Sequence, residues 1–491
     1  MADRLKVLFV SSECAPFAKT GGLGDVVGAL PKALALRGVD VRVVMPLYAG
    51  IPLHELERLE GVLTVPMWYG AARGAVRLGV LPRSTVPVYF LEHHRYFDRS
   101  DIYGDNGEGY RDNLERFAFL SRGALELTKA LGWTPDVVHA HDWQTALAPV
   151  YLNTVERGHP LGRAASVYTI HNLAYQGVHD GASLPVVGLG NEHFNPREFE
   201  HFGSVNLAKA GLVHSTLLTT VSPTYAREIQ TAEHGCLLDG VLAERHGELV
   251  GILNGIDAEE WDPASDRRLA ANFSADDPAA KALCKAALQA EAGLPVRSEV
   301  PVFGLVSRLT PQKGIDVLAQ ALDRLLAWDL QIVLLGTGQP EAERFLEWTA
   351  RRYPDRLSVC LRFDDARAHR TLAGSDFLLM PSRFEPCGLS QLYALRYGAL
   401  PIVRATGGLV DTVENYDERT VSGTGFVFHD LRADSLADTI GWALSAWYQR
   451  PEDVRKLRHR AMTRDFSWRR AADAYRDCYA TARERRRTAA A

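Results

Sequence analysis

Short apolar runs with strand character alternate with amphipathic helical stretches along this sequence. Residues 6–11 form the first run, a glycine-rich turn follows, residues 25–37 have helical spacing, and residues 39–45 supply a second run. Parallel strands of one sheet need a crossover, usually a helix, to connect them. The opening therefore predicts a βαβ unit, and its continuation predicts an α/β fold with doubly wound parallel sheets.

The alternation continues in two regions that turn signals separate. Turn residues gather at residues 252–257 and 261–263, and a chain of 491 residues is too long for one hydrophobic core. We therefore expect two domains with a junction near Asn254. The expected strands are residues 88–91, 137–140, 167–170 and 217–221 in the first domain, and residues 302–306, 332–335, 357–361, 377–380 and 400–403 in the second.

Composition excludes several classes of protein. The chain has 46% hydrophobic and 23% charged residues, and its net charge of -5 gives no general attraction for nucleic acid; the arginine-rich residues 483–487 are interpreted as a solvated terminus. Six cysteines lie far apart without C-x-x-C spacing, which argues against disulfides and zinc. No signal-peptide core or membrane-length apolar run is found. We expect a cytoplasmic protein that binds neither nucleic acid nor membranes.

A Thr-Gly-Gly-Leu segment occurs twice, and residues 20–27 agree with residues 406–413 at six of eight positions. A glycine pair between a strand and a helix lets the backbone approach a ligand, and the amides at the helix start can bind phosphate. The alternative is that both pairs are only tight turns. Lys19 favours ligand contact at the first copy, and both interpretations stay open for the second.

Two cations follow the first strand of the second domain. Arg308 and Lys313 are five residues apart, directly after the run at residues 302–306. Ligands of doubly wound sheets bind at the carboxyl ends of the strands. Cations at that position can stabilise the negative charge that develops on a diphosphate leaving group. Two solvated surface cations are the weaker alternative at this location.

A carboxylate and a glycine lie in the loop after the strand expected at residues 377–380. Glu385 precedes Pro386-Cys387-Gly388, and we expect a helix to begin near Gly388. This order would place a carboxylate for sugar hydroxyls beside amides for phosphate. The alternative is a helix-capping acid, but Pro-Cys-Gly is an unusual helix start and favours close approach to a ligand.

Histidines end two strands of the first domain. His139 and His141 precede Asp142, and His171 precedes Asn172. The three histidines could suggest zinc, but carboxylate or thiolate partners at useful spacing are lacking, so we expect no metal site. Both segments are expected to face the ligand rather than the core.

Together these motifs resemble bacterial glycogen synthases and plant starch synthases, in order and along nearly the whole chain. Related retaining glycosyltransferases tend to carry a second glutamate eight residues after the first, and Tyr393 occupies that position here, as in the synthases. The resemblance implies the GT-B architecture, with two Rossmann-like doubly wound domains and an interdomain cleft. It implies residues 1–253 as the acceptor-side domain, residues 254–464 as the nucleotide-sugar domain, and residues 465–491 as a helix that returns to the first domain.

The resemblance also implies roles for individual residues. The implied catalytic residues are His171, Arg308, Lys313 and Glu385. The implied donor-binding residues are Lys19, Gly21, Gly22, Asp25, Asn172, Asn254, Cys387, Gly388, Leu389, Ser390, Thr406, Gly407 and Gly408, and Asp142 and Phe97 are implied for the acceptor. The sequence departs from the family pattern in two places, at Gln144-Thr145-Ala146 and at Ser100, and these departures concern acceptor contacts more than donor contacts.

For function, the resemblance implies a retaining enzyme that transfers glucose from ADP-glucose to the non-reducing 4-hydroxyl end of an α-1,4-glucan such as glycogen, without metal or pyridoxal phosphate. Only Glu385 is a convincing carboxylate, so a covalent double displacement is not expected. The alternatives are a glucosyltransferase that uses UDP-glucose, a pyridoxal-phosphate phosphorylase, for which no Schiff-base lysine motif stands out, and a silent glucan-binding protein. The phosphate motifs do not read the donor base, and the oligomeric state is left open.

Overall fold

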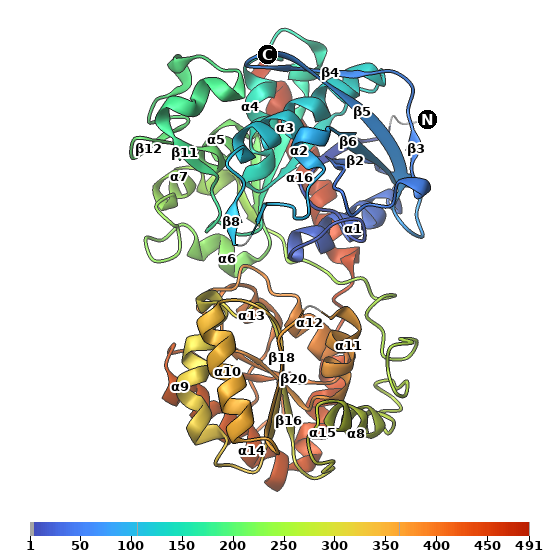
Figure 1. Ribbon diagram of the computed structural model, residues 1–491, viewed down its shortest axis with the longest axis vertical. Coiled ribbons are helices and arrows are strands. Elements are labelled where there is room, and N and C mark those ends of the chain that lie inside the picture. Colours follow the sequence, from blue (N-terminus) through green and yellow to red (C-terminus); the bar gives the residue numbers. More distant parts are fainter. Residues whose placement is uncertain (1–3, 106, 363, 491) are drawn as a thin grey trace. The chain divides into compact units, whose positions relative to one another are not determined.

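The computed structural model describes residues 4–105, 107–362 and 364–490. Contacts between residues divide the chain into two compact units. The first comprises Met1–Gly255 together with Trp468–Ala491, and the second comprises Ile256–Ser467. Each unit is built on a large sheet with parallel strands and surrounding helices (Figure 1).

The large sheet of the first unit is parallel along most of its width. Its parallel strands lie in the order β15, β14, β10, β9, β1, β2 and β6. Their bounds, in that order, are Leu249–Gly251, Leu217–Thr220, Ala165–Ile170, Val137–His141, Lys6–Val10, Asp40–Pro46 and Pro87–Glu92. An antiparallel extension beyond β6 consists of β5 (Gly70–Val80), β3 (Glu57–Arg58) and β4 (Leu63–Met67). The strand order reverses between β1 and β9, which makes this the topological switch point of the sheet.

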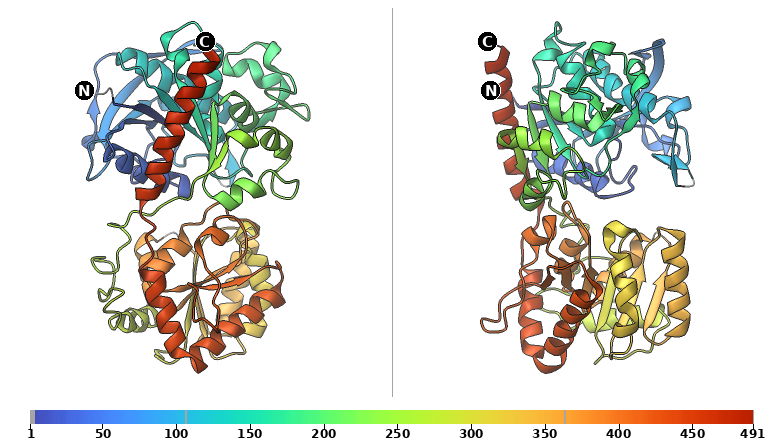
Figure 2. Two further views of the ribbon diagram at one scale, coloured as in Figure 1. Left: turned by 180° about the vertical axis from the view of Figure 1, so that it is seen from behind. Right: turned by 90° about the vertical axis from the view of Figure 1, so that its left-hand side faces the viewer.

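Helices cover this sheet in two groups. Helix α1 (Gly22–Ala35) packs beside α16 (Trp468–Ala490), whereas α3 (Asn113–Ala130), α4 (Leu147–Asn153) and α5 (Leu207–His214) pack in succession. Figure 2 shows α16 in red across the face opposite to that of α3 in Figure 1. An ion pair between Arg37 and Asp473 and a 2.8 Å hydrogen bond between the Tyr479 hydroxyl and His139 fix α16 to this unit.

Smaller elements complete the first unit. They are α2 (His94–Phe97), the hairpin of β7 (Gly104–Asp105) and β8 (Glu108–Gly109), the antiparallel strands β11 (Val178–Asp180), β12 (Glu200–His201) and β13 (Ser204–Asn206), and the helices α6 (Pro223–Glu228) and α7 (Asp239–Glu244).

The sheet of the second unit is parallel throughout, with the strand order β18, β17, β16, β19, β20, β21. The bounds, in that order, are Leu357–Cys360, Gln331–Leu335, Val302–Val306, Phe377–Met380, Leu400–Arg404 and Phe426–Phe428. Its helices are α8 (Lys281–Glu291), α9 (Ile315–Leu325), α10 (Pro340–Arg352), α11 (Asp365–Gly374), α12 (Ser390–Arg396), α13 (Gly407–Thr412), α14 (Ala433–Gln449) and α15 (Pro451–Met462). The order reverses between β16 and β19.

Each strand expected from an apolar run overlaps a strand of the structure, so the predicted α/β class with doubly wound parallel sheets is confirmed. Two helix starts differ from expectation. Helix α1 begins at Gly22 rather than residue 25, because Gly21 is already the extended residue that precedes the helix. Helix α12 begins at Ser390 rather than near Gly388, because Gly388 has a φ of +71°, which a right-handed helix does not contain.

Along the described parts of the chain, every helix is either too short or too polar to cross a membrane.

Candidate active site

Two loops of the second unit meet at its topological switch point. Strands β16 and β19 are hydrogen-bonded neighbours, and the chain leaves them toward opposite sides of the sheet. The loop after β16 carries Arg308 and Lys313, and the loop after β19 carries Glu385. The Arg383 amide donates a 2.8 Å hydrogen bond to the Gln312 carbonyl and so ties the two loops together. Crevices at such switch points are the usual ligand sites of open α/β sheets.

Lys313 and Glu385 form a buried ion pair. The Lys313 Nζ lies 2.6 Å from Glu385 Oε2, and their side chains are 18% and 5% exposed. The Ser382 hydroxyl donates a second hydrogen bond, 2.9 Å long, to the same carboxylate oxygen. The carboxylate that sequence analysis assigned to sugar hydroxyls is therefore held and neutralised by the lysine assigned to the diphosphate. Arg308 is exposed on the same loop as Lys313 and carries a second positive charge.

The second Thr-Gly-Gly-Leu copy packs directly on the Glu385 loop. The Gly408 amide donates a 3.0 Å hydrogen bond to the Glu385 carbonyl. A Cβ at Gly407 would lie 1.9 Å from that carbonyl oxygen, and a Cβ at Gly408 would lie 2.2 Å from the Cys387 carbonyl oxygen. Backbone atoms cannot yield to such contacts, so both glycines are required by packing. The architectural interpretation, left open by the sequence, thus accounts for this copy.

The other donor-binding candidates of the second unit lie around the same loop. Thr406 is buried immediately before α13, Leu389 precedes α12, and the Ser390 hydroxyl lies 3.3 Å from the Val306 carbonyl. Gln391, which sequence analysis missed, donates 2.9 Å hydrogen bonds to the carbonyls of Cys387 and Gly388. An amide side chain inside a helix gave no signal of this role.

In the first unit, a buried carboxylate holds the first Thr-Gly-Gly-Leu copy. Glu13 is 3% exposed and accepts hydrogen bonds from the Thr20 amide (2.7 Å), the Thr20 hydroxyl (2.8 Å), the Gly21 amide (3.3 Å) and the Tyr103 hydroxyl (2.5 Å). Glu13 was not among the predicted site residues, although its carboxylate follows shortly after the first strand in the sequence. These hydrogen bonds to Glu13 thus hold the loop that carries Lys19 and Gly21 in place.

Lys19 and Asp25 pair with each other at the surface of this unit. Their charged atoms lie 3.0 Å apart, with side chains 34% and 28% exposed. A Cβ at Gly21 would meet no atom within 4 Å, and Gly22 opens α1. Unlike the second copy, this copy has no packing demand at Gly21. Its glycine therefore stays available for the predicted ligand contact.

Asp142 and His171 lie at the ends of the adjacent strands β9 and β10. Asp142 has a φ of +55° and a ψ of -178°, a backbone conformation that is costly for any residue other than glycine. Its Oδ1 accepts hydrogen bonds from the amides of His171 (2.7 Å) and Asn172 (3.4 Å). Burial raises the pKa of Asp142 to about 7. Burial also lowers the pKa of His171 to about 3, so the imidazole stays neutral. The structure thus brings together the predicted His171, Asn172 and Asp142.

Two further candidates belong to other segments of the first unit. Asn254 is buried after β15, and its Oδ1 has no hydrogen-bond partner among the described residues. Phe97 ends α2 with no exposed surface, and its ring packs against Tyr48 at 6.0 Å and Phe119 at 6.0 Å. Its ring therefore has no surface in this structure with which to contact a glucan chain. Among the described residues, no group of three or more His, Cys, Asp and Glu side chains is arranged to hold a metal ion.

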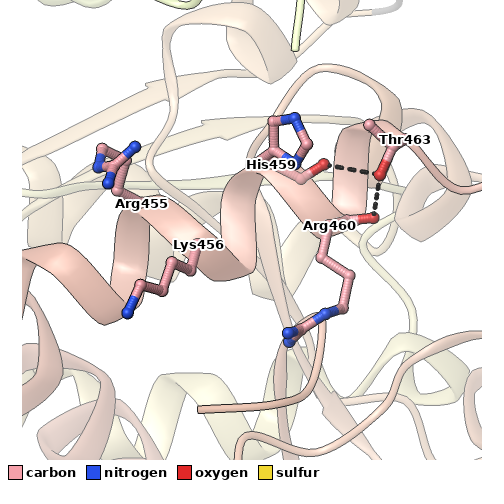
Figure 3. Close-up of a pocket in the computed structure, with 5 residues that line it drawn as sticks. All are labelled: Arg455, Lys456, His459, Arg460 and Thr463. Atoms are coloured by element: carbon pink, nitrogen blue, oxygen red, sulfur yellow. Dashed lines mark hydrogen bonds between the residues drawn. The ribbon is translucent and has the colours of Figure 1, made fainter. Parts of the chain in front are cut away.

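A cavity of about 470 Å³ on α15 is lined by Arg455, Lys456, His459, Arg460 and Thr463 (Figure 3). Its cations serve local structure. Arg460 donates to the carbonyls of Val421 and Gly423 at 3.1 to 3.2 Å, and Arg455 pairs with Glu452 at 2.7 Å. None of the residues predicted from the sequence lines this cavity, so it is not the candidate active site.

Comparison with known families covers both units. Residues 6–244 match the family model for the starch synthase catalytic domain, and residues 289–462 match that for glycosyl transferases group 1. The chain is 51% identical over 487 residues to glycogen synthase 1 of Geobacter sulfurreducens, covering 98% of this chain and 97% of the relative. It is 46% identical over 491 residues to the glycogen synthase of Moorella thermoacetica, covering 100% and 99%.

Solved structures agree with these families. The catalytic domain of starch synthase IV from Arabidopsis thaliana, bound to ADP and acarbose, superposes with a TM-score of 0.92 at 34% identity, covering 98% of this chain and all of that one. Sucrose-phosphate synthase from Thermosynechococcus elongatus superposes with a TM-score of 0.60 at 19% identity, covering 97% of this chain, and shares the fold. The predicted GT-B fold class is confirmed.

Proposed function

Because the chain belongs to the glycogen and starch synthase family and is therefore a glycosyltransferase, we propose that it transfers glucose from ADP-glucose to the non-reducing 4-hydroxyl end of an α-1,4-glucan with retention of configuration. One observation carries the proposal. The near full-length similarity to glycogen synthases coincides with the Lys313–Glu385 pair at the switch point of the second unit. The starch synthase that superposes on this chain was solved with ADP and acarbose.

Arg308 and Lys313 stabilise the leaving diphosphate in this proposal. Cleavage of a sugar–phosphate bond places negative charge on the leaving oxygen, and fixed cations beside that oxygen favour the charge most in the transition state. Because Glu385 already orients Lys313 at 2.6 Å, the ammonium need not reorganise when the bond breaks. Loss of one such group lowers turnover by about 100- to 1,000-fold.

Within the second unit, Glu385 is the proposed contact for glucose hydroxyls. Within the first unit, the proposed contacts for glucose are His171 and Asn172. Asp142 holds the His171 and Asn172 backbone through its Oδ1, and Glu13 holds the loop with Lys19. The leaving phosphate accepts the proton of the attacking 4-hydroxyl, so no covalent protein intermediate is needed. The absence of a second carboxylate partner for Glu385 in the sequence motifs supports this route.

Neither a metal nor pyridoxal phosphate takes part in the proposed reaction, because the cations of the protein supply the charge that Mg²⁺ would supply elsewhere. Activity should therefore survive EDTA. A large loss in EDTA that magnesium restores would contradict this part of the proposal. We also propose a cytoplasmic location, for which cell fractionation is the test.

Purified protein incubated with glycogen and either ADP-glucose or UDP-glucose tests the function. We expect ADP release together with lengthening of the glucan chains. Preference for UDP-glucose would replace the donor in the proposal. If the protein transfers glucose from neither donor, the remaining alternative is a glucan-binding protein without catalytic activity. Sedimentation together with glycogen would then detect that binding.

A further inference from the structure

Three histidine rings lie next to one another in the first unit, and the last of them, His171, is a predicted glucose contact. His139 and His141 belong to β9, and His171 follows β10. The ring centroids of His139 and His141 are 4.1 Å apart, and those of His141 and His171 are 5.3 Å apart. His139 and His141 have no exposed surface, and His171 is 8% exposed. Only His171 is assigned a role so far.

A single hydrogen bond joins the rings of His141 and His171. Nδ1 of His141 lies 3.0 Å from Nε2 of His171, within hydrogen-bond distance. Burial lowers the pKa of both rings, well below the usual value for His141 and to about 3 for His171. Both imidazoles are therefore neutral, and each carries one N–H and one lone pair. One ring must donate and the other must accept.

The surroundings of the other ring nitrogen of His141, Nε2, determine which of the two rings donates this hydrogen bond. Its Nε2 is buried and has no hydrogen-bond partner among the described residues, and the ring packs on Phe9 at 5.2 Å and on His139. A proton on Nε2 would be a buried N–H without an acceptor, which folded proteins rarely tolerate, whereas a lone pair there is an unsatisfied acceptor, which they tolerate better. The proton therefore belongs on Nδ1.

We propose that His141 is a positioning residue whose Nδ1–H donates to Nε2 of His171 and so fixes the proton of His171 on Nδ1. The Nδ1 of His171 can then donate a hydrogen bond to a ligand but cannot accept one. The assignment of that ligand as the transferred glucose rests on the proposed function. The assignment of the proton rests only on the geometry of the histidines.

A neutral donor suits the proposed reaction. The glucose develops positive charge toward an oxocarbenium-like transition state, and an imidazolium beside it would repel that charge. A neutral Nδ1–H instead fixes one sugar hydroxyl as an acceptor without adding charge. When a hydrogen bond sets the tautomer of a catalytic imidazole, the wrong tautomer lowers turnover by orders of magnitude.

Neighbouring contacts keep the rings in place. Nδ1 of His139 lies 2.8 Å from the Tyr479 hydroxyl of α16, and its Nε2 lies 2.6 Å from the Thr169 hydroxyl. Both nitrogens of His139 are thus engaged, and neither is available to His141. On the other side, Asp142 holds the His171 amide at 2.7 Å. The contacts of His139 on one side and of the His171 amide on the other therefore keep the His141 and His171 rings in position.

Nitrogen NMR of protein labelled with ¹⁵N-histidine tests the tautomer directly. The His171 signals are identified by their loss in H171Q. Near neutral pH we expect the long-range nitrogen–proton pattern of a neutral ring protonated on Nδ1. The pattern of a ring protonated on Nε2 overturns the proposal. This readout needs no substrate, so it stands even if the wild-type protein transfers no glucose, a result that would contradict the proposed function alone.

Two His141 variants separate positioning from packing. In H141N the amide nitrogen takes the place of Nδ1, so His171 should keep its tautomer and turnover should stay within about fivefold of wild type. In H141F the ring still packs on Phe9 but offers no donor, so His171 should show mixed tautomers and kcat should fall at least tenfold, with KM for the donor little changed. H139F is the matched control: it damages the same core but leaves the His141 donor, so the His171 tautomer should persist. Wild-type kcat and tautomer in H141F, or equal loss in H141N and H141F, would refute the proposal.

Discussion

Replacing Lys313 with alanine should leave a buried carboxylate without its cation. The Glu385 side chain is 5% exposed and lies 2.6 Å from the Lys313 Nζ. After the substitution, the Ser382 hydroxyl at 2.9 Å is the remaining side-chain donor that the structure gives the carboxylate. A neutral hydroxyl cannot replace a full positive charge, so the folded state should lose stability as well as activity.

The size of the loss follows from the geometry. Opposite charges at the observed distance attract by about 6 kcal/mol at an effective dielectric constant of roughly 20. Part of this attraction offsets the desolvation of both groups, and loss of one partner from a buried pair typically costs about 3–5 kcal/mol. Removing both charges, in K313M combined with E385Q, should cost much less, because no unpaired charge remains.

Urea unfolding of the second unit, followed together with glucosyl transfer, measures both effects. Because the chain has two units, the transition of the second unit must be resolved before a free energy of unfolding is assigned. R324A is the control, since Arg324 and Asp438 lie 2.6 Å apart on the same unit with side chains 46% and 67% exposed. Breaking that solvated pair should cost at most about 1 kcal/mol.

We expect K313A to unfold at lower urea and to lose about 100- to 1,000-fold in turnover. K313M/E385Q should recover most of the stability and none of the turnover. A stability of K313A equal to that of R324A would refute the buried-charge reasoning. Full activity of K313A would remove Lys313 from the active site.

Three further outcomes are expected. Gly408→Ala should destabilise the second unit, because its Cβ would lie 2.2 Å from the Cys387 carbonyl oxygen. Gly21→Ala should keep the unfolding midpoint, because its Cβ would meet no atom within 4 Å, and should instead raise KM for ADP-glucose. Glu13→Ala should raise KM for ADP-glucose at least tenfold, whereas Glu13→Gln, which keeps a hydrogen-bond acceptor, should have a smaller effect. Equal KM values for the two variants in steady-state kinetics would contradict this. The pKa of Asp142 is raised from 3.8 to about 7, so its stabilising contribution is complete below about pH 4 and is lost as pH rises through 7. The free energy of unfolding of Asp142→Asn relative to wild type should therefore increase between those pH values in urea titrations, and a constant difference would contradict the shift.

The sequence located the loops of the site because their positions depend on local patterns. Strands β1, β9, β16 and β19 are apolar runs that periodicity identifies, and residues just after such strands gather at the carboxyl edge of a parallel sheet. This reasoning needs no knowledge of side-chain contacts. It therefore placed Arg308 and Glu385 correctly in loops that follow strands of the second domain, although it did not predict that β16 and β19 are neighbours.

The partners within the site could not be predicted, because they join distant parts of the chain. Glu13 and Tyr103 are 90 residues apart, and Lys313 and Glu385 are 72 residues apart. The antiparallel extension was missed for a different reason. Strand β5 contains Gly70, Gly74 and Gly79, and glycine is depleted in strands, so its pattern gave no strand signal.

The two Thr-Gly-Gly-Leu copies show where sequence repetition stops being informative. Both copies open a helix after a parallel strand, α1 beginning at Gly22 and α13 at Gly407, and their residues agree at six of eight positions. Yet Gly407 and Gly408 touch the backbone of the Glu385 loop, while Gly21 has open space around it and a buried carboxylate beneath it. The second copy positions a protein loop, so its substitution changes folding and binding together. At Gly21 of the first copy an added Cβ would meet no protein atom within 4 Å, so a substitution there isolates what the ligand requires of this position.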